Sequence, residues 1–284
     1  MSEPQVLFVG CDKGSWQMRG RQIGRALGAR CTSKPVGADW QSADVIVLVK
    51  RAAETWFREA KASTAILIWD VLDVWHQPIA NQRAAEEHIR DIVQLARVLN
   101  VRTLIGATEV MATQLGGVYL PHHCRLGLST GLVRSQARRI GYDGSARYLG
   151  SWKPAIERAC ERLGLQFVVN PRELTDVDAL VAFRGEEWDG WACRQWKSGV
   201  KYVNAIVAGR PILTQACAGF SEIAPTGLTI ERPEELSDAL AALCARDLRW
   251  RAYDQGRARA HDFTLEAIAS RYRRILRSAV RAAA

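Results

Sequence analysis

The sequence lacks several features that would assign it to a common class. It contains no apolar run of the length, about 18 residues, that crosses a bilayer. The amino terminus, Met1-Ser2-Glu3-Pro4, has neither the basic region nor the long apolar region of a signal peptide, so we expect the chain to stay in the cytoplasm. None of the seven cysteines lies in a C-x-x-C pair, which argues against a disulfide framework and against a zinc site. The loop after the first predicted strand is Gly10-x-x-x-Gly14 and not G-x-G-x-x-G, so NAD binding is not expected.

What the sequence does contain is typical of a globular protein of two domains. It has 284 residues, of which 48% are hydrophobic and 24% charged. The formal net charge is +9. The larger part of this excess, 18 basic against 12 acidic residues, lies in residues 1–139. A basic surface favours polyanions such as nucleic acid, anionic lipid or acidic glycans, although an arginine-rich coding bias would give the same composition.

Buried strands alternate with amphipathic helices along the whole chain. This alternation predicts α/β architecture with parallel, doubly wound sheets. The loop-like stretch 121–138 interrupts it, and the pattern then restarts. We therefore predict two Rossmann-like domains facing a cleft, residues 1–138 and 139–284, with the last helix possibly crossing back onto the first domain. The predicted strands are 5–10, 43–50, 65–69, 103–106, 118–120, 139–142, 166–169, 179–183, 212–214 and 228–230, and the main helices are 17–28, 52–62, 81–99, 109–115, 153–163, 233–244, 247–262 and 265–280.

The segment 197–211 is the most informative part of the chain. Lys197 and Lys201 are four residues apart and share one face of a helix, and Asn204 lies one turn further on. Ammonium groups near a helix start suit a diphosphate, because cations and unpaired backbone N–H groups both attract anions there. Glu222, after the next strand, could accept hydrogen bonds from ribose hydroxyls.

This segment resembles the donor-nucleotide region of GT-B glycosyltransferases. The matching residues are Lys197, Ser198, Lys201, Asn204, Ala205, Ala208, Gly209 and Pro211, followed by Gly219, Phe220 and Glu222. The resemblance implies a GT-B fold and a nucleotide-diphosphate sugar, taken here as a UDP-sugar, as the donor substrate, with no further cofactor. The alternative is an ordinary crossover helix with a solvated basic face.

Further donor-binding candidates follow other predicted strands. Arg184 comes just after the strand 179–183, at the edge where ligands bind such sheets, although a surface arginine would look the same. Gly144 and Ser145 could let the backbone approach a phosphate, or form a plain turn. Gly14 and Ser15, at a predicted helix start in the first domain, could meet the donor phosphate or merely cap the helix.

Acid–base candidates lie in the first domain. The loop 69–78 holds Asp70, Asp73 and His76, and a carboxylate or imidazole can take a proton from an acceptor hydroxyl. Its Trp75 could stack on a sugar, or the indoles could belong to the core. Asp70-x-x-Asp73 is not the D-x-D metal motif of GT-A enzymes, and we predict no metal.

The acceptor side of the cleft has its own candidates. Asp12, as a further catalytic candidate, and Trp16 flank the loop after the first strand, which lines the acceptor side in related GT-B enzymes. His122 and His123 are adjacent, so they cannot both point into the cleft from a strand. The indole-rich segment 185–196 is either a wall beside the nucleotide or a satellite core.

The sequence therefore predicts an enzyme, a glycosyltransferase acting from a nucleotide-diphosphate sugar. Its acceptor is either a surface glycan or lipid-linked saccharide, or a hydroxymethylated DNA base. In the DNA case the arginines of 134–139 would neutralise phosphates. The alternatives are a nucleotide-sugar epimerase of the same fold and a non-catalytic nucleic-acid-binding protein. The sequence leaves the oligomeric state open.

Overall fold

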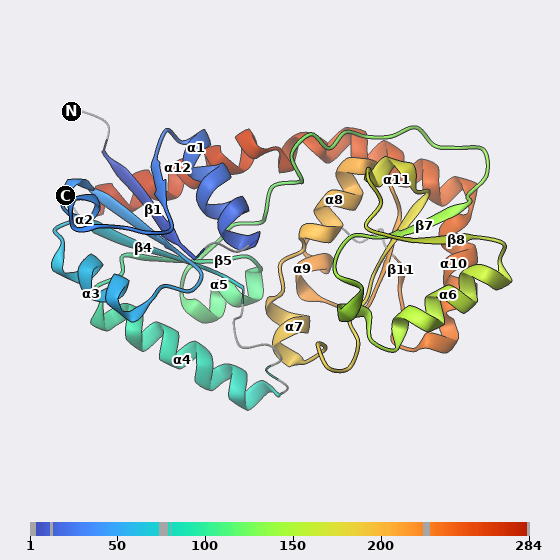
Figure 1. The fold of residues 1–284 in the computed structure, drawn as a ribbon, viewed down its shortest axis with the longest axis horizontal. Coiled ribbons are helices and arrows are strands. Elements are labelled where there is room, and N and C mark those ends of the chain that lie inside the picture. The colour runs from blue at the N-terminus through green and yellow to red at the C-terminus, as the bar shows by residue number, and fades with distance from the viewer. Residues whose placement is uncertain (1–3, 12–13, 74–78, 80, 224–227, 283–284) are drawn as a thin grey trace.

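The protein is described by a computed structural model, which places residues 4–11, 14–73, 79, 81–223 and 228–282 (Figure 1). Two lobes lie side by side, each built on a parallel sheet, as the alternating pattern predicted. Within the described residues, every helix falls short of the length and apolarity needed to span a bilayer.

The first lobe contains a six-stranded parallel sheet in the order β2-β1-β3-β4-β5-β6. Its strands are β1 Val6–Gly10, β2 Arg30–Thr32, β3 Val45–Val49, β4 Ile66–Leu72, β5 Thr103–Gly106 and β6 Val118–Tyr119. The connecting helices are a π-helical turn Trp16–Gln22, α1 Ile23–Ala26, α2 Gly37–Ser42, α3 Glu54–Ala62, α4 Gln82–Val98 and α5 Glu109–Leu115. The buried runs of β1, β3 and β4 place these strands at the centre, where both faces of the sheet are covered.

The second lobe contains a five-stranded parallel sheet in the order β11-β10-β9-β7-β8. Its strands are β7 Arg139–Tyr142, β8 Gln166–Val169, β9 Ala179–Ala182, β10 Ile212–Thr214 and β11 Leu228–Thr229. The helices that follow or connect them are α6 Trp152–Arg162, α7 Trp191–Trp196, α8 Val200–Ala208, α9 Ala218–Ser221, α10 Leu236–Cys244, α11 Arg246–Arg259 and α12 Leu265–Arg281, with short 3₁₀ turns at Ala146–Leu149, Leu174–Asp176, Pro233–Glu235 and Ala260–Phe263.

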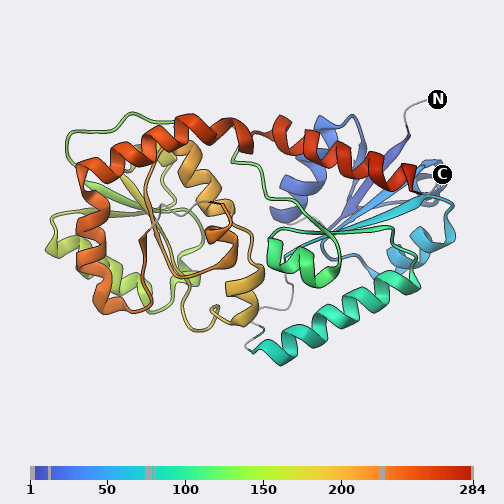
Figure 2. The same ribbon diagram turned by 180° about the vertical axis from the view of Figure 1, so that it is seen from behind.

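Two segments from the second half of the sequence complete the core of the first lobe. Helix α12 runs from the second lobe to the first (Figure 2) and buries Ile268, Tyr272 and Leu276 against β1, β3 and the π-helical turn. On the opposite face of the sheet, Trp196 of α7 joins the cluster formed with α3, α4 and α5. Apolar contacts thus tie the lobes together at both faces of the first sheet.

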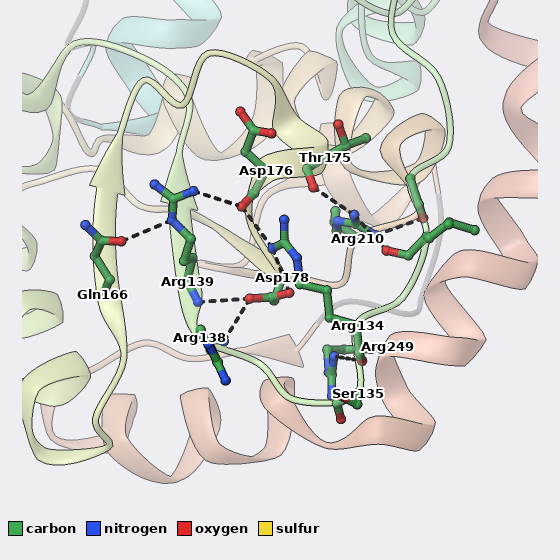
Figure 3. Close-up of polar contacts among 12 residues, drawn as sticks. Arg134, Ser135, Arg138, Arg139, Gln166, Thr175, Asp176, Asp178, Arg210 and Arg249 are labelled. Carbon is green, nitrogen blue, oxygen red and sulfur yellow. Dashed lines mark hydrogen bonds and ion pairs between the residues drawn. The ribbon is translucent and has the colours of Figure 1, made fainter.

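The connection 121–138 packs along the second lobe and is held there by arginines. Buried Arg210 donates to the carbonyls of Gly131, Leu132 and Thr175, with N···O distances of 3.0 to 3.1 Å. Buried Arg249 donates to the carbonyls of Arg134 and Ser135 (Figure 3). Charged donors paired with backbone carbonyls in this way fix an otherwise irregular segment.

Candidate active site

An ion-pair bridge between the two lobes is centred on Asp73, which follows β4. Lys50, which follows β3, lies 2.5 Å from its Oδ1, and Lys197 of the second lobe lies 2.8 Å from its Oδ2. Burial alone would raise the pKa of Asp73, but the ammonium groups of Lys197 and Lys50 outweigh it and hold that pKa well below its usual range. Asp73 is therefore ionised and bridges the domains.

A cationic pocket opens beside this bridge at the carboxyl edge of the second sheet. Arg184 lines it after β9, and Lys197, Ser198 and Lys201 line it from the start of α8. Burial, and then the positive charge of Arg184, lower the pKa of Lys201 to about 7. The pocket thus holds more positive charge than its own acids neutralise, as an anion-binding site requires.

Two groups fix the position of Lys201. Its Nζ lies 3.8 Å from the centre of the Tyr142 ring, a cation–π contact. A Cβ on Gly144 would lie 3.0 Å from the same nitrogen, and the φ of Gly144 is +147°, which a side chain rarely permits. A side chain at position 144 would therefore strain the backbone and crowd the ammonium.

A pair of glycines brings the start of α8 close to the loop after β10. A Cβ on Gly199 would lie 2.0 Å from the carbonyl oxygen of Gly219, and a Cβ on Gly219 would lie 2.3 Å from the carbonyl oxygen of Lys197. Only the missing side chains allow this approach. These two glycines therefore hold the backbone at Lys197 against the start of α9, beside the pocket.

The remaining small residues predicted for the donor lie at turns. Ser198 is buried in the pocket wall. The backbone N–H of Gly144 donates to Asn170 Oδ1 at 2.7 Å, and the Ser145 carbonyl accepts from the N–H of Tyr148 at 3.0 Å. Gly14 and Ser15 precede the π-helical turn in the first lobe, where Gly14 is exposed and Ser15 makes no capping hydrogen bond.

Asn204 and Glu222 are engaged elsewhere in this structure. Asn204 is buried, and its Oδ1 accepts from the backbone N–H of Arg125 at 2.8 Å, which fastens the interdomain connection to α8. Glu222 Oε1 accepts from the N–H of Glu109 at 2.9 Å, at the start of α5 in the other lobe. Burial raises the pKa of Glu222, and the N–H groups of Glu109 and Val110 oppose that effect. Both side chains hold the lobes or the connection in place.

Asp70 and Trp16 lie in the core of the first lobe. The prediction of a strand 65–69 with Asp70 in the following loop was wrong, because β4 continues to Leu72 and buries Asp70 completely. Asp70 Oδ2 lies 3.6 Å from the Nε of Arg19 and accepts from the hydroxyl of Tyr272 at 3.2 Å, and burial raises the pKa of Asp70. The Trp16 ring is buried against the backbones of Gly10 and Gly20. Neither side chain reaches the cleft, so we give both structural roles.

The adjacent histidines differ in their surroundings. The ring nitrogens of His123 lie 2.6 Å from the Cys124 carbonyl and 3.3 Å from the Met18 carbonyl, so this side chain is fully engaged. His122 is also buried, but its Nδ1 has no hydrogen-bond partner among the described residues. Burial and then the charge of Arg19 lower the pKa of His122, while Asp73 opposes the shift. His122 is therefore a neutral imidazole near the Asp73 bridge.

Three predicted residues, Asp12, Trp75 and His76, lie outside the described residues. Sequence reasoning also missed Lys50, whose only signal is its position directly after a buried strand.

The tryptophans of 191–196 prove to be interdomain core. Trp196 is fully buried, and its Nε1 donates to Gln114 Oε1 of the first lobe at 2.5 Å.

The fold is that of the GT-B class, as solved structures of that class show. Anabaena Alr3699/HepE in complex with UDP is 12% identical, with a TM-score of 0.69 over 96% of this chain and 100% of that one. A glycosyltransferase from Rickettsia africae ESF-5 is 10% identical, with a TM-score of 0.63 over 98% and 99% of the two chains. WaaG, a glycosyltransferase involved in lipopolysaccharide biosynthesis, is 13% identical, with a TM-score of 0.54 over 94% and 98%. No protein-family model matches the sequence, and no curated protein does.

Proposed function

We propose that the protein is a glycosyltransferase that uses a UDP-sugar as donor. The observation that carries this proposal is the cationic pocket of Arg184, Lys197 and Lys201 at the domain boundary. Negative charge develops on the leaving diphosphate as the glycosidic bond breaks, and fixed cations stabilise it. The proposal is further supported by the fold shared with HepE, which has been crystallised with UDP and with UDP-glucose.

Before the donor binds, the ammonium of Lys197 is paired with the carboxylate of Asp73. A diphosphate carries more negative charge than one carboxylate, so it competes for the Lys197 ammonium at the mouth of the pocket. Lys50 then remains as the partner that keeps Asp73 ionised. This exchange couples donor binding to the bridge between the lobes.

We assign His122 to the acceptor side of the site. Its Nδ1 is unpartnered among the described residues, and it lies near enough to Lys197 and Asp73 for their charges to act on it. In the reaction, the acceptor oxygen loses its proton to a base and forms a bond to the anomeric carbon, while the bond from that carbon to the diphosphate breaks.

The positions of the arginines in residues 134–139 favour a glycan or lipid-linked saccharide over DNA as the acceptor. Arg134 pairs with Asp178 at 3.1 Å, and Arg139 donates to Gln166 and to the carbonyl of Asp176 (Figure 3). The backbone N–H groups of Arg138 and Arg139 also donate to Asp178. The side chains of Arg134 and Arg139 are thus engaged within the second lobe, which leaves fewer guanidinium groups in this segment for DNA phosphates.

The test is calorimetric titration of the purified protein with UDP, together with release of UDP from UDP-sugars. Lys197→Met and Lys201→Met should each weaken UDP binding about tenfold or more, the usual effect of losing a charge-assisted contact. Lys61→Met, which removes an exposed lysine from α3, is the matched control and should bind as the wild type does. The proposal fails if the wild type does not bind UDP, or if the control loses as much affinity as the pocket variants.

A further inference from the structure

The outward face of α12 carries a row of arginines that serve no internal contact. Arg273, Arg274, Arg277 and Arg281 are exposed, and none has a hydrogen-bond or ion-pair partner among the described residues. The spacing of 273, 277 and 281 repeats every four residues, so these side chains form one stripe along the helix. The other exposed residues near them are serines, Ser270 before the row and Ser278 within it.

The arginines of the stripe are not balanced by acidic residues on the same helix. The one acidic residue of α12, Glu266, is in its first turn, and the rest of the helix lacks any carboxylate at i±4 that could pair with these arginines. On a neighbouring helix, Arg25 of α1 is also exposed and unpaired among the described residues. Fixing unpaired like charges side by side is unfavourable, so this face is suited to a partner of opposite charge.

The position of the stripe selects the kind of partner. Helix α12 lies along the outside of the molecule and covers one face of the first sheet (Figure 2), and the residues that line the pocket belong to other elements. A row of arginines on the outer face of a helix fits a flat anionic surface. It offers no exposed aromatic side chain on which a base could stack, and a duplex bound here would not bring a base to the pocket.

We infer that this face of α12 docks the protein on a membrane surface containing anionic phospholipids. Arginines next to such a surface are attracted to it additively, each strengthening binding about fivefold, and a shallow, reversible attachment of this kind requires no membrane-spanning segment. The inference is independent of the proposed donor, since it concerns a different face of the molecule.

The test is co-sedimentation of the full-length protein with vesicles of phosphatidylcholine alone or of phosphatidylcholine containing phosphatidylglycerol. The wild type should bind only the anionic vesicles and be released by salt. The variant Arg273→Gln/Arg277→Gln/Arg281→Gln should bind them on the order of 100-fold less tightly. Glutamine keeps helix propensity, and the positions are exposed, so the variant should fold, which its melting temperature checks.

The matched control removes the same charge from the opposite face of the same lobe. Arg58→Gln/Lys61→Gln/Arg97→Gln changes exposed residues on α3 and α4 and should retain vesicle binding within a few-fold. Equal loss in both variants would show that only net charge matters and would overturn the inference. So would absence of binding to anionic vesicles, or salt-sensitive binding of duplex DNA that depends on the same three arginines while vesicles are ignored.

Discussion

The lowered pKa of Lys201 makes UDP binding a proton-coupled event. In the free protein this pKa is about 7, because burial and the nearby Arg184 disfavour the ammonium form. A bound diphosphate would supply the missing negative charge and raise the pKa again. At pH 8 the free side chain is about one-tenth protonated, so binding should take up about 0.9 proton, while at pH 6 the uptake by Lys201 itself falls to about 0.1. The terminal phosphate of UDP, with a second pKa of about 6, is already ionised at pH 8.

The assay is titration calorimetry with UDP at pH 8 in buffers of different ionisation enthalpy. The slope of the observed enthalpy against the buffer enthalpy gives the number of protons taken up. Lys201→Met should abolish the uptake as well as weaken binding, whereas Lys61→Met should leave both unchanged. Binding of UDP without proton uptake, or uptake that persists in Lys201→Met, would refute the assignment of Lys201 to the diphosphate.

The same shift has a consequence for stability. Between pH 7 and about 10.5 the unfolded chain holds a proton on Lys201 that the folded chain lacks, so the free energy of unfolding contributed by this residue rises with pH across that window. At pH 8 the folded protein bears a cost of about 3 kcal/mol for keeping Lys201 neutral. Lys201→Met should therefore increase the melting temperature while it weakens UDP binding. A lower melting temperature would show that the contact with Tyr142 outweighs the cost of burial.

Three further predictions concern the contacts that hold the lobes and the connection. Asp73→Asn should lower the free energy of unfolding by about 2–3 kcal/mol near neutral pH, since it leaves two lysines without their carboxylate. Because the pKa of Asp73 is lowered, the stability that Asp73 contributes is present above about pH 4 and is lost as the pH falls further. Denaturant curves of the variant and the wild type should therefore converge in strong acid. Gly20→Ala places a Cβ 1.9 Å from the Trp16 ring and should cost about 1–3 kcal/mol in thermal unfolding, whereas Gly37→Ala, which meets nothing within 4 Å, should change little. Arg210→Met should speed proteolytic cleavage between residues 125 and 135, as it removes the donors that hold those carbonyls; cleavage at the wild-type rate would mean that the remaining contacts suffice.

Much of the fold could be predicted from local patterns, and the boundaries of β5, β7, β8 and β10 match the predictions to the residue. Strand β2 was missed because it spans three half-exposed residues, Arg30–Thr32, which show no alternation to detect. The strand β4 was predicted too short because an aspartate inside a buried strand argues against it. The groups that stabilise Asp70 there, Arg19 and Tyr272, lie far away in the sequence.

In the candidate site too, local sequence patterns predict some of the residues that lie together, whereas other contacts depend on the tertiary structure. Lys197, Ser198 and Lys201 lie together because they are close in sequence, and Arg184 joins them because strand ends share one edge of the sheet. The bridge from Lys197 to Asp73 joins residues 124 positions apart, and no local pattern could have paired them. Asn204 and Glu222 match the motif in sequence, yet their partners come from the connection and from α5, which only the tertiary structure brings near.

The crossing of α12 onto the first sheet has a consequence for biosynthesis. On the ribosome, residues 4–120 are made before α12, and until then one face of their sheet is covered only in part, by Trp16, Ile23 and Leu120. The second lobe has all of its strands and its two apolar clusters before α12 begins. The lobe that is synthesised first is thus the last to be completed, and the apolar surface that α12 covers stays open to chaperones and to aggregation until that helix is made.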